Sequence, residues 1–433
     1  MKQGSQGSVL MLSTHGYVSS EPELSKPDTG GQVVFVLEMA KRFARFGYEV
    51  DLVTRQFEDQ PEEEPIQPNC RVWRVPYGGK EFIPKEDMHD YIDEFVTNFL
   101  NAVDAQGLHY DVVHSHYWDA GYAGMKIAEA LGLPHIHTPH SVGEWKRQRM
   151  LEKGSSQEEL ERTYRFAERF EAERQVYQSS EYLICTTPQQ QELIEEAYEV
   201  SPDKMTVIPA GIDDERFTPS FAATPRVIRD RFQFTDTDVY TVGRAADNKG
   251  IDLLIRAFPY LRELVPEARL QLAVGSGTEQ DQQLIESWKQ LASDLGVADR
   301  THWIGYIPDG MMPDYYRAAG VFALPSRYEP FGMTAIEAMA CGTPTVVTVH
   351  GGLCGRLNFG EHGLYADPFD PQEFGTMLAM PIRYPRLRER LATYGAELAR
   401  QQFGWSGIAK QTLKVFHHVS RYGPLGGPAP TGG

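Results

Sequence analysis

The glutamates Glu329 and Glu337 stand eight residues apart in the stretch SRYEPFGMTAIEAMACGTP, residues 326–344. An alanine-rich, helix-like run starts between them, and the backbone N–H groups at a helix start attract anions. Carboxylates accept hydrogen bonds from sugar and ribose hydroxyls. The two acids therefore predict hydroxyl recognition beside a bound phosphate, with Gly332, Met333 and Thr334 presenting N–H groups to it. An ordinary first-turn acid would explain Glu337 alone, but not Glu329.

Two cations, Arg244 and Lys249, lie five residues apart in VGRAADNKG, residues 242–250, after a short apolar strand. Arginine can bind two phosphate oxygens at once, and lysine acts as a point charge. A loop of this kind at a strand end suits a diphosphate. A solvated charged turn is the alternative, and the residues of this loop alone do not decide between the two.

A glycine pair and a glutamine, Gly30, Gly31 and Gln32, separate the first apolar strand from the helix-like run that follows. Glycine lets backbone N–H groups approach a ligand closely because it has no Cβ atom, and Gln32 adds a donor and an acceptor. A tight turn that needs positive φ would explain one glycine. The pair followed by Gln32 favours a loop that contacts an anionic or sugar ligand.

A histidine and a serine, His140 and Ser141, follow the strand-like HIHTP segment, and Lys146 comes five residues after the serine. His135 and His137 alternate along that strand, a spacing that also occurs in metal sites. No carboxylate or cysteine stands at a matching spacing, so packing is favoured over zinc for this pair. His140, at the strand end, is the histidine that we expect to be functional.

Neither a metal site nor a nicotinamide cofactor is expected. The four cysteines form no CxxC pair, which favours small buried hydrophobes in a reducing compartment. They are Cys70, Cys185, Cys341 and Cys354. The GSG segment at 275–277 follows a strand but lacks the later glycine of the dinucleotide fingerprint, which disfavours a dehydrogenase.

Short apolar strands alternate with longer amphipathic helices along the 433 residues, which predicts two doubly wound, Rossmann-like α/β domains with parallel sheets. Ligands bind beyond the carboxyl ends of such strands, where the polar residues above are found. The expected strands are VLMLS, YEVDLVT, YDVVHSH, HIHTPH and YLICTT in the first domain and VYTVG, LQLAVG, THWIGY, VFALPS and TPTVVT in the second. We place the domains at 1–213 and 214–404, a helix that crosses back to the N-terminal domain at 405–422, and a disordered tail at 423–433.

The composition is that of a globular protein, with 41% hydrophobic and 24% charged residues and no apolar run long enough to span a membrane. The N-terminus shows no secretory pattern, so a cytoplasmic location is expected. The formal net charge of −18 would repel nucleic acid, and the densest basic cluster, EWKRQRM at 144–150, is short. Neither a nucleic acid nor a membrane is therefore expected as a partner.

Three motifs together resemble the retaining, nucleotide-sugar-dependent glycosyltransferases of family 4, which have the GT-B fold with two domains facing across a cleft. They are DTGGQ near the start, GRAADNKG in the middle and EPFGMTAIE, with its E-x7-E pattern, late in the chain. Within this family, STHGYV, SHYWDAG and TPHSVGEWK resemble the branch of the sucrose-phosphate and mannosylfructose-phosphate synthases, and VHGGL and LYADPFD are similar to the mannosylfructose enzymes in particular. Both kinds of enzyme use fructose 6-phosphate as acceptor.

The resemblance implies roles for the matching residues, with an N-terminal acceptor-binding domain and a C-terminal nucleotide-sugar-binding domain. Arg244 and Lys249 would hold the donor diphosphate, Glu337 the ribose and Glu329 the transferred sugar, whereas His140 would contact that sugar near the reacting carbon. Together, His140, Glu329, Arg244 and Lys249 are the implied catalytic residues. Further donor contacts would come from Gly31 and from the backbone amides of Phe331, Gly332 and Met333. The implied acceptor-binding residues are Gly31, Gln32, Lys85, Tyr117, Ser141, Lys146 and Arg169.

The leading hypothesis from sequence is transfer of a hexosyl group to fructose 6-phosphate, giving sucrose 6-phosphate from UDP-glucose or another nucleoside diphosphate glucose. Mannosylfructose 6-phosphate from GDP-mannose is the alternative product. A transferase with another phosphorylated or polyol acceptor, a non-catalytic sugar-phosphate sensor, and a phosphorylase or epimerase of the same fold are further alternatives. No cofactor is expected to be required, because the nucleotide sugar is a substrate, and Mg²⁺ is expected at most to stimulate. If the product is dephosphorylated, a separate phosphatase would act on it.

Overall fold

The chain forms two compact α/β units in a computed structural model that describes residues 5–22, 28–29, 31–152, 155–219, 225–275, 279–329 and 331–422. Unit 1 comprises Met1–Ala210 and Ile408–Gly433, and unit 2 comprises Gly211–Gly407. The predictions made for Gly30, for the end of the GSG segment and for the tail at 423–433 concern positions outside the described residues.

Unit 1 is built on a sheet with the strand order β3-β4-β2-β1-β5-β6-β7-β8. Its neighbouring strands are parallel except for the antiparallel pair β3 and β4. The strands are β1 Gly7–Leu12, β2 Tyr48–Gln56, β3 Glu63–Gln67, β4 Cys70–Pro76, β5 Val112–His116, β6 His135–Thr138, β7 Tyr182–Cys185 and β8 Met205–Val207. The helices are α1 Gly31–Arg45, α2 Ile92–Gln106, α3 Trp118–Leu131, α4 Gly143–Glu152, α5 Gln157–Tyr164, α6 Phe166–Ser179, α7 Pro188–Tyr198 and α15 Trp405–Tyr422, which begins in unit 2 and ends in unit 1.

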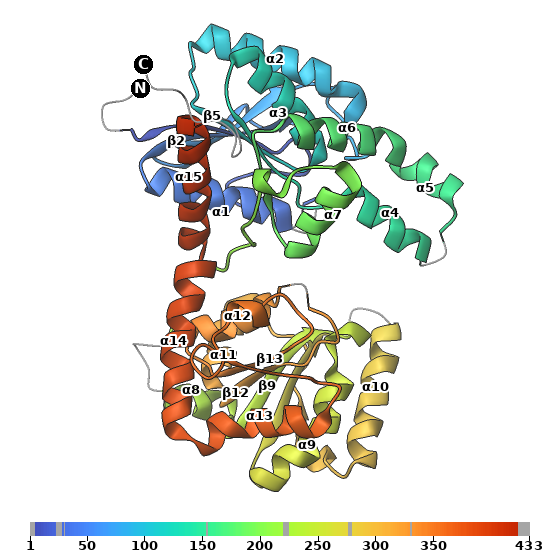
Figure 1. The fold of residues 1–433 in the computed structure, drawn as a ribbon, viewed down its shortest axis with the longest axis vertical. Coiled ribbons are helices and arrows are strands. Elements are labelled where there is room, and N and C mark those ends of the chain that lie inside the picture. Colours follow the sequence, from blue (N-terminus) through green and yellow to red (C-terminus); the bar gives the residue numbers. More distant parts are fainter. Residues whose placement is uncertain are drawn as a thin grey trace. The chain divides into compact units, whose positions relative to one another are not determined.

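Helices cover both faces of the unit 1 sheet because successive side chains of a strand point to opposite faces. On β5, Val113 belongs to a core cluster with α2 and α3. Its neighbour His114 instead contacts Phe416 of α15, with the ring centroids 5.3 Å apart. Phe416 also packs on Phe43 of α1 at 5.3 Å. Figure 1 shows α2 and α3 on one side of this sheet and α1 with α15 on the other.

Unit 2 contains a parallel sheet with the order β11-β10-β9-β12-β13-β14. The strands are β9 Asp238–Arg244, β10 Arg269–Gly275, β11 Thr301–Trp303, β12 Val321–Leu324, β13 Thr345–Thr348 and β14 Leu364–Ala366. The helices are α8 Pro225–Phe232, α9 Ile251–Leu264, α10 Glu279–Asp294, α11 Met312–Ala318, α12 Met333–Ala340, α13 Pro371–Arg383 and α14 Pro385–Phe403. Tyr240 faces a core cluster with α11 and α12, whereas the adjacent Val239 faces one with α9 and α13.

The predicted α/β class is confirmed, and each of the ten expected strand segments contains a strand. The antiparallel strand β3 was not predicted, because its sequence EEPIQ is polar, contains a proline and lies at the sheet edge, where proline is tolerated. One prediction about the cysteines is wrong. Cys354 is only partly buried and its Sγ donates to the carbonyl oxygens of Val349 and Gly351, whereas the other three cysteines are buried as expected.

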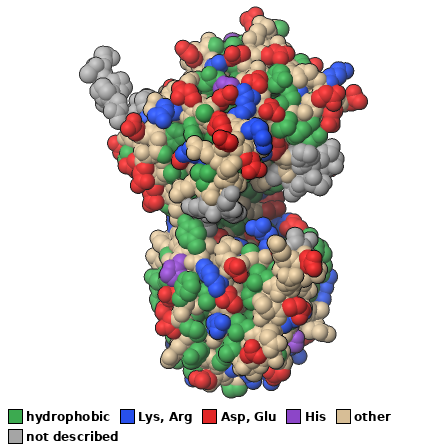
Figure 2. All heavy atoms as spheres, turned by 90° about the vertical axis from the view of Figure 1, so that its right-hand side faces the viewer, with side chains coloured by type: hydrophobic (Ala, Val, Ile, Leu, Met, Phe, Trp, Pro, Cys, Tyr) green, Lys and Arg blue, Asp and Glu red, His purple; other side chains and the backbone are tan. Residues whose placement is uncertain are grey.

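Acidic side chains are spread over the face drawn in Figure 2, and Lys and Arg side chains lie scattered among them. That distribution agrees with the net charge of −18. Within the described ranges, every helix is too short or too polar to cross a membrane.

Candidate functional site

The structure brings Lys249 and Glu329 of unit 2 together, although they are 80 residues apart in sequence. Lys249 ends the short 3-10 turn after β9, and Glu329 lies in the loop after β12, the neighbouring strand of the sheet. The Lys249 Nζ lies 2.8 Å from the Glu329 Oε2, which also accepts a hydrogen bond from Ser326 at 3.2 Å. Both side chains are partly buried, with 25% and 14% exposed. The pair therefore forms a preorganised charged site at the carboxyl ends of two adjacent parallel strands, as expected for a ligand site in such a sheet.

Arg327 joins the two loops that carry this pair. Its guanidinium donates to both carboxylate oxygens of Asp252 at 2.7 Å and to the Asp247 carbonyl at 2.8 Å. Its backbone N–H donates to the Asn248 carbonyl at 3.0 Å. Arg327 thus fixes the turn after β9, which carries Lys249, to the loop after β12, which carries Glu329.

Gly250, directly after Lys249, has no room for a side chain. Its φ is +64°, and an added Cβ would lie 2.0 Å from the Pro325 carbonyl oxygen. We expect Gly250→Ala to lower the free energy of unfolding by about 2–5 kcal/mol, because strain at positive φ and a backbone clash add. Gly296→Ala is the matched control, since Gly296 has a φ of +66° but no described atom within 4 Å of an added Cβ, and it should cost about 1 kcal/mol. Equal urea-unfolding losses in the two variants would contradict the close approach at Gly250.

The start of α12 lies beside Glu329 in sequence and has a left-handed glycine, Gly332, at its N-cap with a φ of 88°. The backbone N–H groups of Phe331, Gly332 and Met333 donate to no acceptor among the described residues. The Phe331 ring is buried and packs edge-on against Phe403 at 5.5 Å, which anchors the loop. This helix start is therefore available to an anion.

Glu337, one turn further along α12, is oriented by a tyrosine from α11. The Tyr316 hydroxyl, which is fully buried, donates to the Glu337 Oε2 at 2.7 Å. Burial raises the pKa of Glu337 to about 7, although the hydrogen bond from Tyr316 and the charge of Arg216 act in the opposite direction. Arg216 is itself paired with Asp309 at 2.5 Å. Glu337 is thus a carboxyl group that changes charge near neutral pH.

Arg244, at the end of β9, is exposed and forms no ion pair with any residue in the described part of the chain. Its side chain is therefore available to a ligand, in contrast to Lys249. The structure does not bring Arg244 into contact with the pair of Lys249 and Glu329.

In unit 1, two of the predicted acceptor-binding lysines share one carboxylate. Lys85 and Lys146 lie 3.5 Å and 3.3 Å from the Glu86 Oε1. Lys85 also forms an ion pair with Asp28, and Lys146 lies 4.2 Å above the ring of Tyr164. Burial lowers the pKa of Lys146, and the nearby positive charges of Arg169 and Lys85 lower it further, whereas Glu86 opposes the shift. Two positive charges are thus held close together, with a third nearby.

That third charge, Arg169 of α6, is buried and hydrogen-bonded on three sides. It donates to Glu173 at 2.8 Å, to the Tyr117 hydroxyl at 3.3 Å and to the Ser141 carbonyl oxygen at 3.1 Å. Because Tyr117 accepts from Arg169, the proton of its hydroxyl is free to point to another acceptor. Five of the predicted acceptor residues therefore form one cluster: Lys85, Tyr117, Ser141, Lys146 and Arg169.

Two further predicted residues of unit 1, Gln32 and His140, contact His116 at the end of β5. Gln32 donates to the His116 carbonyl oxygen at 3.3 Å, and His140 lies 3.0 Å from the His116 Nδ1 through its Nε2. His140 has a positive φ of 58°. Gly31 begins α1 and is exposed, and an added Cβ there would have no atom of the described residues within 4 Å.

His140 belongs to a group of five buried or partly buried histidines, with His114, His116, His135 and His137. The Ser115 Oγ lies 2.7 Å from the His135 Nε2 and 2.8 Å from the His137 Nδ1, which fits the expected packing role of that pair. Burial lowers the pKa of His114, His135 and His140 to about 3, and those of His116 and His137 lie well below the ordinary value. All five are therefore neutral at pH 7. No group of three His, Cys, Asp or Glu side chains within the described ranges is arranged to hold a metal ion.

Several residues of these clusters were not singled out from sequence, namely Asp28, Glu86, Asp119, Glu173, Tyr316 and Ser326. Asp119 is fully buried and accepts from Thr14 at 2.5 Å and from His15 at 3.0 Å. Burial acts to raise the pKa of Asp119, but His15 and Thr14 outweigh it and hold the pKa below its ordinary value. Asp119 stands inside the SHYWDAG segment that carried the resemblance, so its position was a usable signal.

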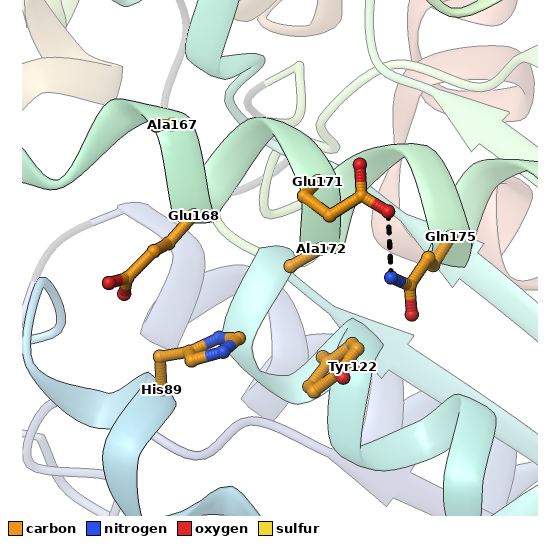
Figure 3. Close-up of a pocket in the computed structure, with 7 residues that line it drawn as sticks. All are labelled: His89, Tyr122, Ala167, Glu168, Glu171, Ala172 and Gln175. Carbon is orange, nitrogen blue, oxygen red and sulfur yellow. Dashed lines mark hydrogen bonds between the residues drawn. The ribbon is translucent and has the colours of Figure 1, made fainter.

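Figure 3 shows a separate pocket of unit 1, lined by His89, Tyr122 and one face of α6. On that face, Glu171 accepts a hydrogen bond from Gln175 at 2.8 Å, as the dashed line in Figure 3 marks. None of the predicted site residues lines this pocket. Glu171 thus offers a carboxylate on the same helix as Arg169 but outside the cluster.

Two family descriptions match the chain in the order of its two units. Glycosyltransferase Family 4 covers residues 29–216, and Glycosyl transferases group 1 covers residues 228–398. The mannosylfructose-phosphate synthase of Agrobacterium fabrum is 47% identical over 410 residues, which are 94% of this chain and 90% of that protein. A D-inositol 3-phosphate glycosyltransferase of Xylanimonas cellulosilytica is 33% identical, over 96% of this chain and 98% of its own length. The solved sucrose-phosphate synthase of Thermosynechococcus elongatus has a TM-score of 0.66 and 26% identity, and the match covers 96% of this chain and 99% of that one.

The chain therefore belongs to the group 1 glycosyltransferases of family 4, with the GT-B fold. It is a hexosyltransferase that depends on a nucleotide sugar. The family resemblance inferred from the three motifs is confirmed.

Proposed function

We propose that this hexosyltransferase uses fructose 6-phosphate as acceptor and retains the anomeric configuration of the donor sugar. The observation that carries the acceptor is the cluster of Lys85, Lys146 and Arg169 in a chain with a net charge of −18. The three cations are paired with the carboxylates of Asp28, Glu86 and Glu173. A phosphate monoester can compete with such carboxylates because its oxygens accept several charge-assisted hydrogen bonds at once. The Tyr117 and Ser141 hydroxyls beside them can contact the sugar.

On the donor side, the charge that develops on the departing diphosphate is stabilised by Arg244, Lys249 and the start of α12. These groups act electrostatically, and donors that are fixed before the reaction are the effective ones. Binding of the diphosphate draws Lys249 from Glu329, whose carboxylate then accepts hydrogen bonds from the hydroxyls of the transferred sugar. The ion pair seen at 2.8 Å keeps both side chains in place before the donor arrives.

Transfer proceeds on one face of the sugar. The bond from the anomeric carbon to the diphosphate oxygen breaks, the bond to the fructose hydroxyl oxygen forms, and the hydroxyl proton passes to the leaving phosphate. Neutral His140 contacts the transferred sugar near that carbon. No cofactor is part of this scheme, Mg²⁺ at most stimulates, and a separate phosphatase would remove the product's phosphate.

The donor in this proposal is GDP-mannose, which makes the product mannosylfructose 6-phosphate. The 47% identity with a mannosylfructose-phosphate synthase supports this choice over the glucosyl donor favoured from sequence. Sucrose 6-phosphate from UDP-glucose is the second candidate, supported by the similarity to the solved sucrose-phosphate synthase.

A donor panel tests the proposal directly. The protein is assayed with GDP-mannose, GDP-glucose, ADP-glucose and UDP-glucose, each with fructose 6-phosphate, free fructose or inositol 3-phosphate. We expect turnover with GDP-mannose and fructose 6-phosphate, and an unchanged anomeric configuration by NMR of the product. Turnover restricted to glucosyl donors would establish sucrose-phosphate synthesis instead, and turnover restricted to inositol 3-phosphate would refute the acceptor.

The pH dependence of donor use should report Glu337. Because burial raises the pKa of Glu337 to about 7, its carboxylate form, which accepts from ribose hydroxyls, prevails only above that pH. Measured between pH 6 and 8.5, kcat/KM for the nucleotide sugar should rise about fivefold from pH 6 to 7, about twofold more from pH 7 to 8, and then level off. Glu337→Gln should abolish this dependence, whereas Glu286→Gln, on the exposed side of α10, should keep it. A Glu337→Gln enzyme with the wild-type profile would contradict the assignment.

A further inference from the structure

The carboxylate of Glu173, on α6, is fully buried. It accepts from Arg169 at 2.8 Å and, with both oxygens, from the backbone N–H of Gly143 at 3.0 Å. The Tyr198 hydroxyl of α7 is a further donor to it. A buried charge is costly unless it is paired and hydrogen-bonded, and here donors from three helices satisfy it.

Gly143 and Glu173 fit each other closely. Gly143 is the first residue of α4, and an added Cβ there would lie 2.8 Å from the Glu173 Oε2 and 3.0 Å from the Arg169 Nε. The start of α4 therefore sits directly against the ion pair of Glu173 and Arg169. The direction of α4 depends on this contact, and α4 carries Lys146 one turn later.

Glu173 thus contacts Arg169, one cation of the proposed acceptor site, and holds the helix that carries Lys146, another cation of that site. Arg169 extends from α6 toward Tyr117 and Ser141, and Lys146 extends from α4 toward Glu86. Any nearby carboxylate would stabilise the charge of Arg169. Stabilising that charge does not require the second contact of Glu173, to the backbone N–H of Gly143 in α4. The double contact fixes the two cations relative to each other.

We propose that Glu173 is a positioning residue that holds the Arg169 side chain and the start of α4 in fixed positions. Arg169 and Lys146 can then bind the phosphate of the acceptor together. The proposal rests on the proposed function, because it takes the acceptor to be a phosphorylated sugar. A displacement of about 1 Å of the residues that position a substrate costs on the order of a hundredfold in rate.

The first test is a comparison of Michaelis constants for the full chain. Glu173→Gln keeps the shape of the side chain but removes the charge and turns one acceptor oxygen into a donor. We expect at least a tenfold rise in KM for fructose 6-phosphate, with KM for the nucleotide sugar within twofold of wild type. Glu171→Gln is the matched control, because Glu171 is on the same helix but lines the separate pocket of Figure 3, and it should leave both constants unchanged. An unchanged KM for fructose 6-phosphate, or equal rises for both substrates, would overturn the proposal.

A second readout does not depend on the identity of the acceptor sugar. Calorimetry with inorganic phosphate should show binding to the wild-type chain and at least tenfold weaker binding to Glu173→Gln, with equal affinity of both proteins for GDP. If fructose 6-phosphate is not a substrate but this loss is seen, the proposed acceptor fails and the role of Glu173 stands. Equal phosphate affinity in the two proteins, or none in the wild type, would refute that role.

Tyr198→Phe keeps the test decisive if Glu173→Gln does not fold. It removes a single hydrogen bond to the carboxylate, so we expect about a threefold loss of phosphate affinity in the same direction. Wild-type affinity in a folded Tyr198→Phe chain would count against the proposal.

Discussion

Replacing Lys249 with methionine should lower kcat for glycosyl transfer by about 10²–10³-fold, because one preorganised charge on the leaving group is then lost. The loss goes beyond a missing cation. The Glu329 carboxylate, which lies 2.8 Å from the Lys249 Nζ in the wild-type structure, would face the donor diphosphate without a counter-charge. Steady-state kinetics with saturating donor and acceptor measures the effect.

Lys289→Met is the matched control for this variant. Lys289 forms an ion pair with Glu286 at 2.6 Å in the same unit, but both side chains are exposed on α10. Exposed pairs of this kind contribute little to stability, and we expect kcat within twofold of wild type. A Lys249→Met enzyme that keeps kcat within threefold would remove Lys249 from the proposed mechanism.

Unit 1 should lose stability steeply between pH 6.5 and 5. Five histidines of this unit have pKa values held far below 6.5, mainly by burial: His114, His116, His135, His137 and His140. The folded unit keeps them neutral, whereas the unfolded chain protonates them near pH 6.5 and so binds more protons. Their stabilising contribution is complete above pH 6.5 and is lost as the pH falls, by up to about 1.4 kcal/mol per pH unit for each histidine. Urea unfolding at a series of pH values, followed by hydrogen exchange of peptides that contain β5 and β6, measures it for this unit.

Single substitutions calibrate that pH dependence. His137→Gln should reduce the slope of unfolding free energy against pH by the contribution of one histidine. His302→Gln, at an exposed position of β11 in unit 2, should leave that slope unchanged. A unit 1 whose urea midpoint is constant from pH 7 to 5 would show that the buried histidines already take up protons in the folded state.

The sequence predicted best those features that local patterns encode. Lys249 and Glu329 each follow a short apolar strand, and parallel strands bring their carboxyl ends to one edge of a sheet, so their approach could be expected. Their 2.8 Å contact could not, because it depends on β9 and β12 being neighbours and on Arg327 joining the two loops.

Contacts between distant helices left no signal in the sequence. Tyr316 reaches Glu337 from another helix, and nothing in the spacing around Tyr316 distinguishes it from an ordinary core tyrosine. Glu173 looked like one of many acids on an amphipathic helix, and only the packing of α4 and α7 against α6 shows that it is buried. Strand β3 was missed for a different reason. The apolar pattern used to find strands detects buried strands, and the polar residues of β3 suit a sheet edge instead.

The division of unit 1 into two chain segments has a consequence for protein synthesis. Phe43 and Tyr48 near the start of the chain contact Phe416 and His417 of α15, with the Tyr48 hydroxyl 2.6 Å from the His417 Nε2. On the ribosome, all of unit 2 emerges before these two partners do. The apolar face of α1 that bears Phe43 is therefore left uncovered while unit 2 folds, and such surfaces are the ones that chaperones bind and that aggregate. The unit that starts first during translation is thus the one that is completed last.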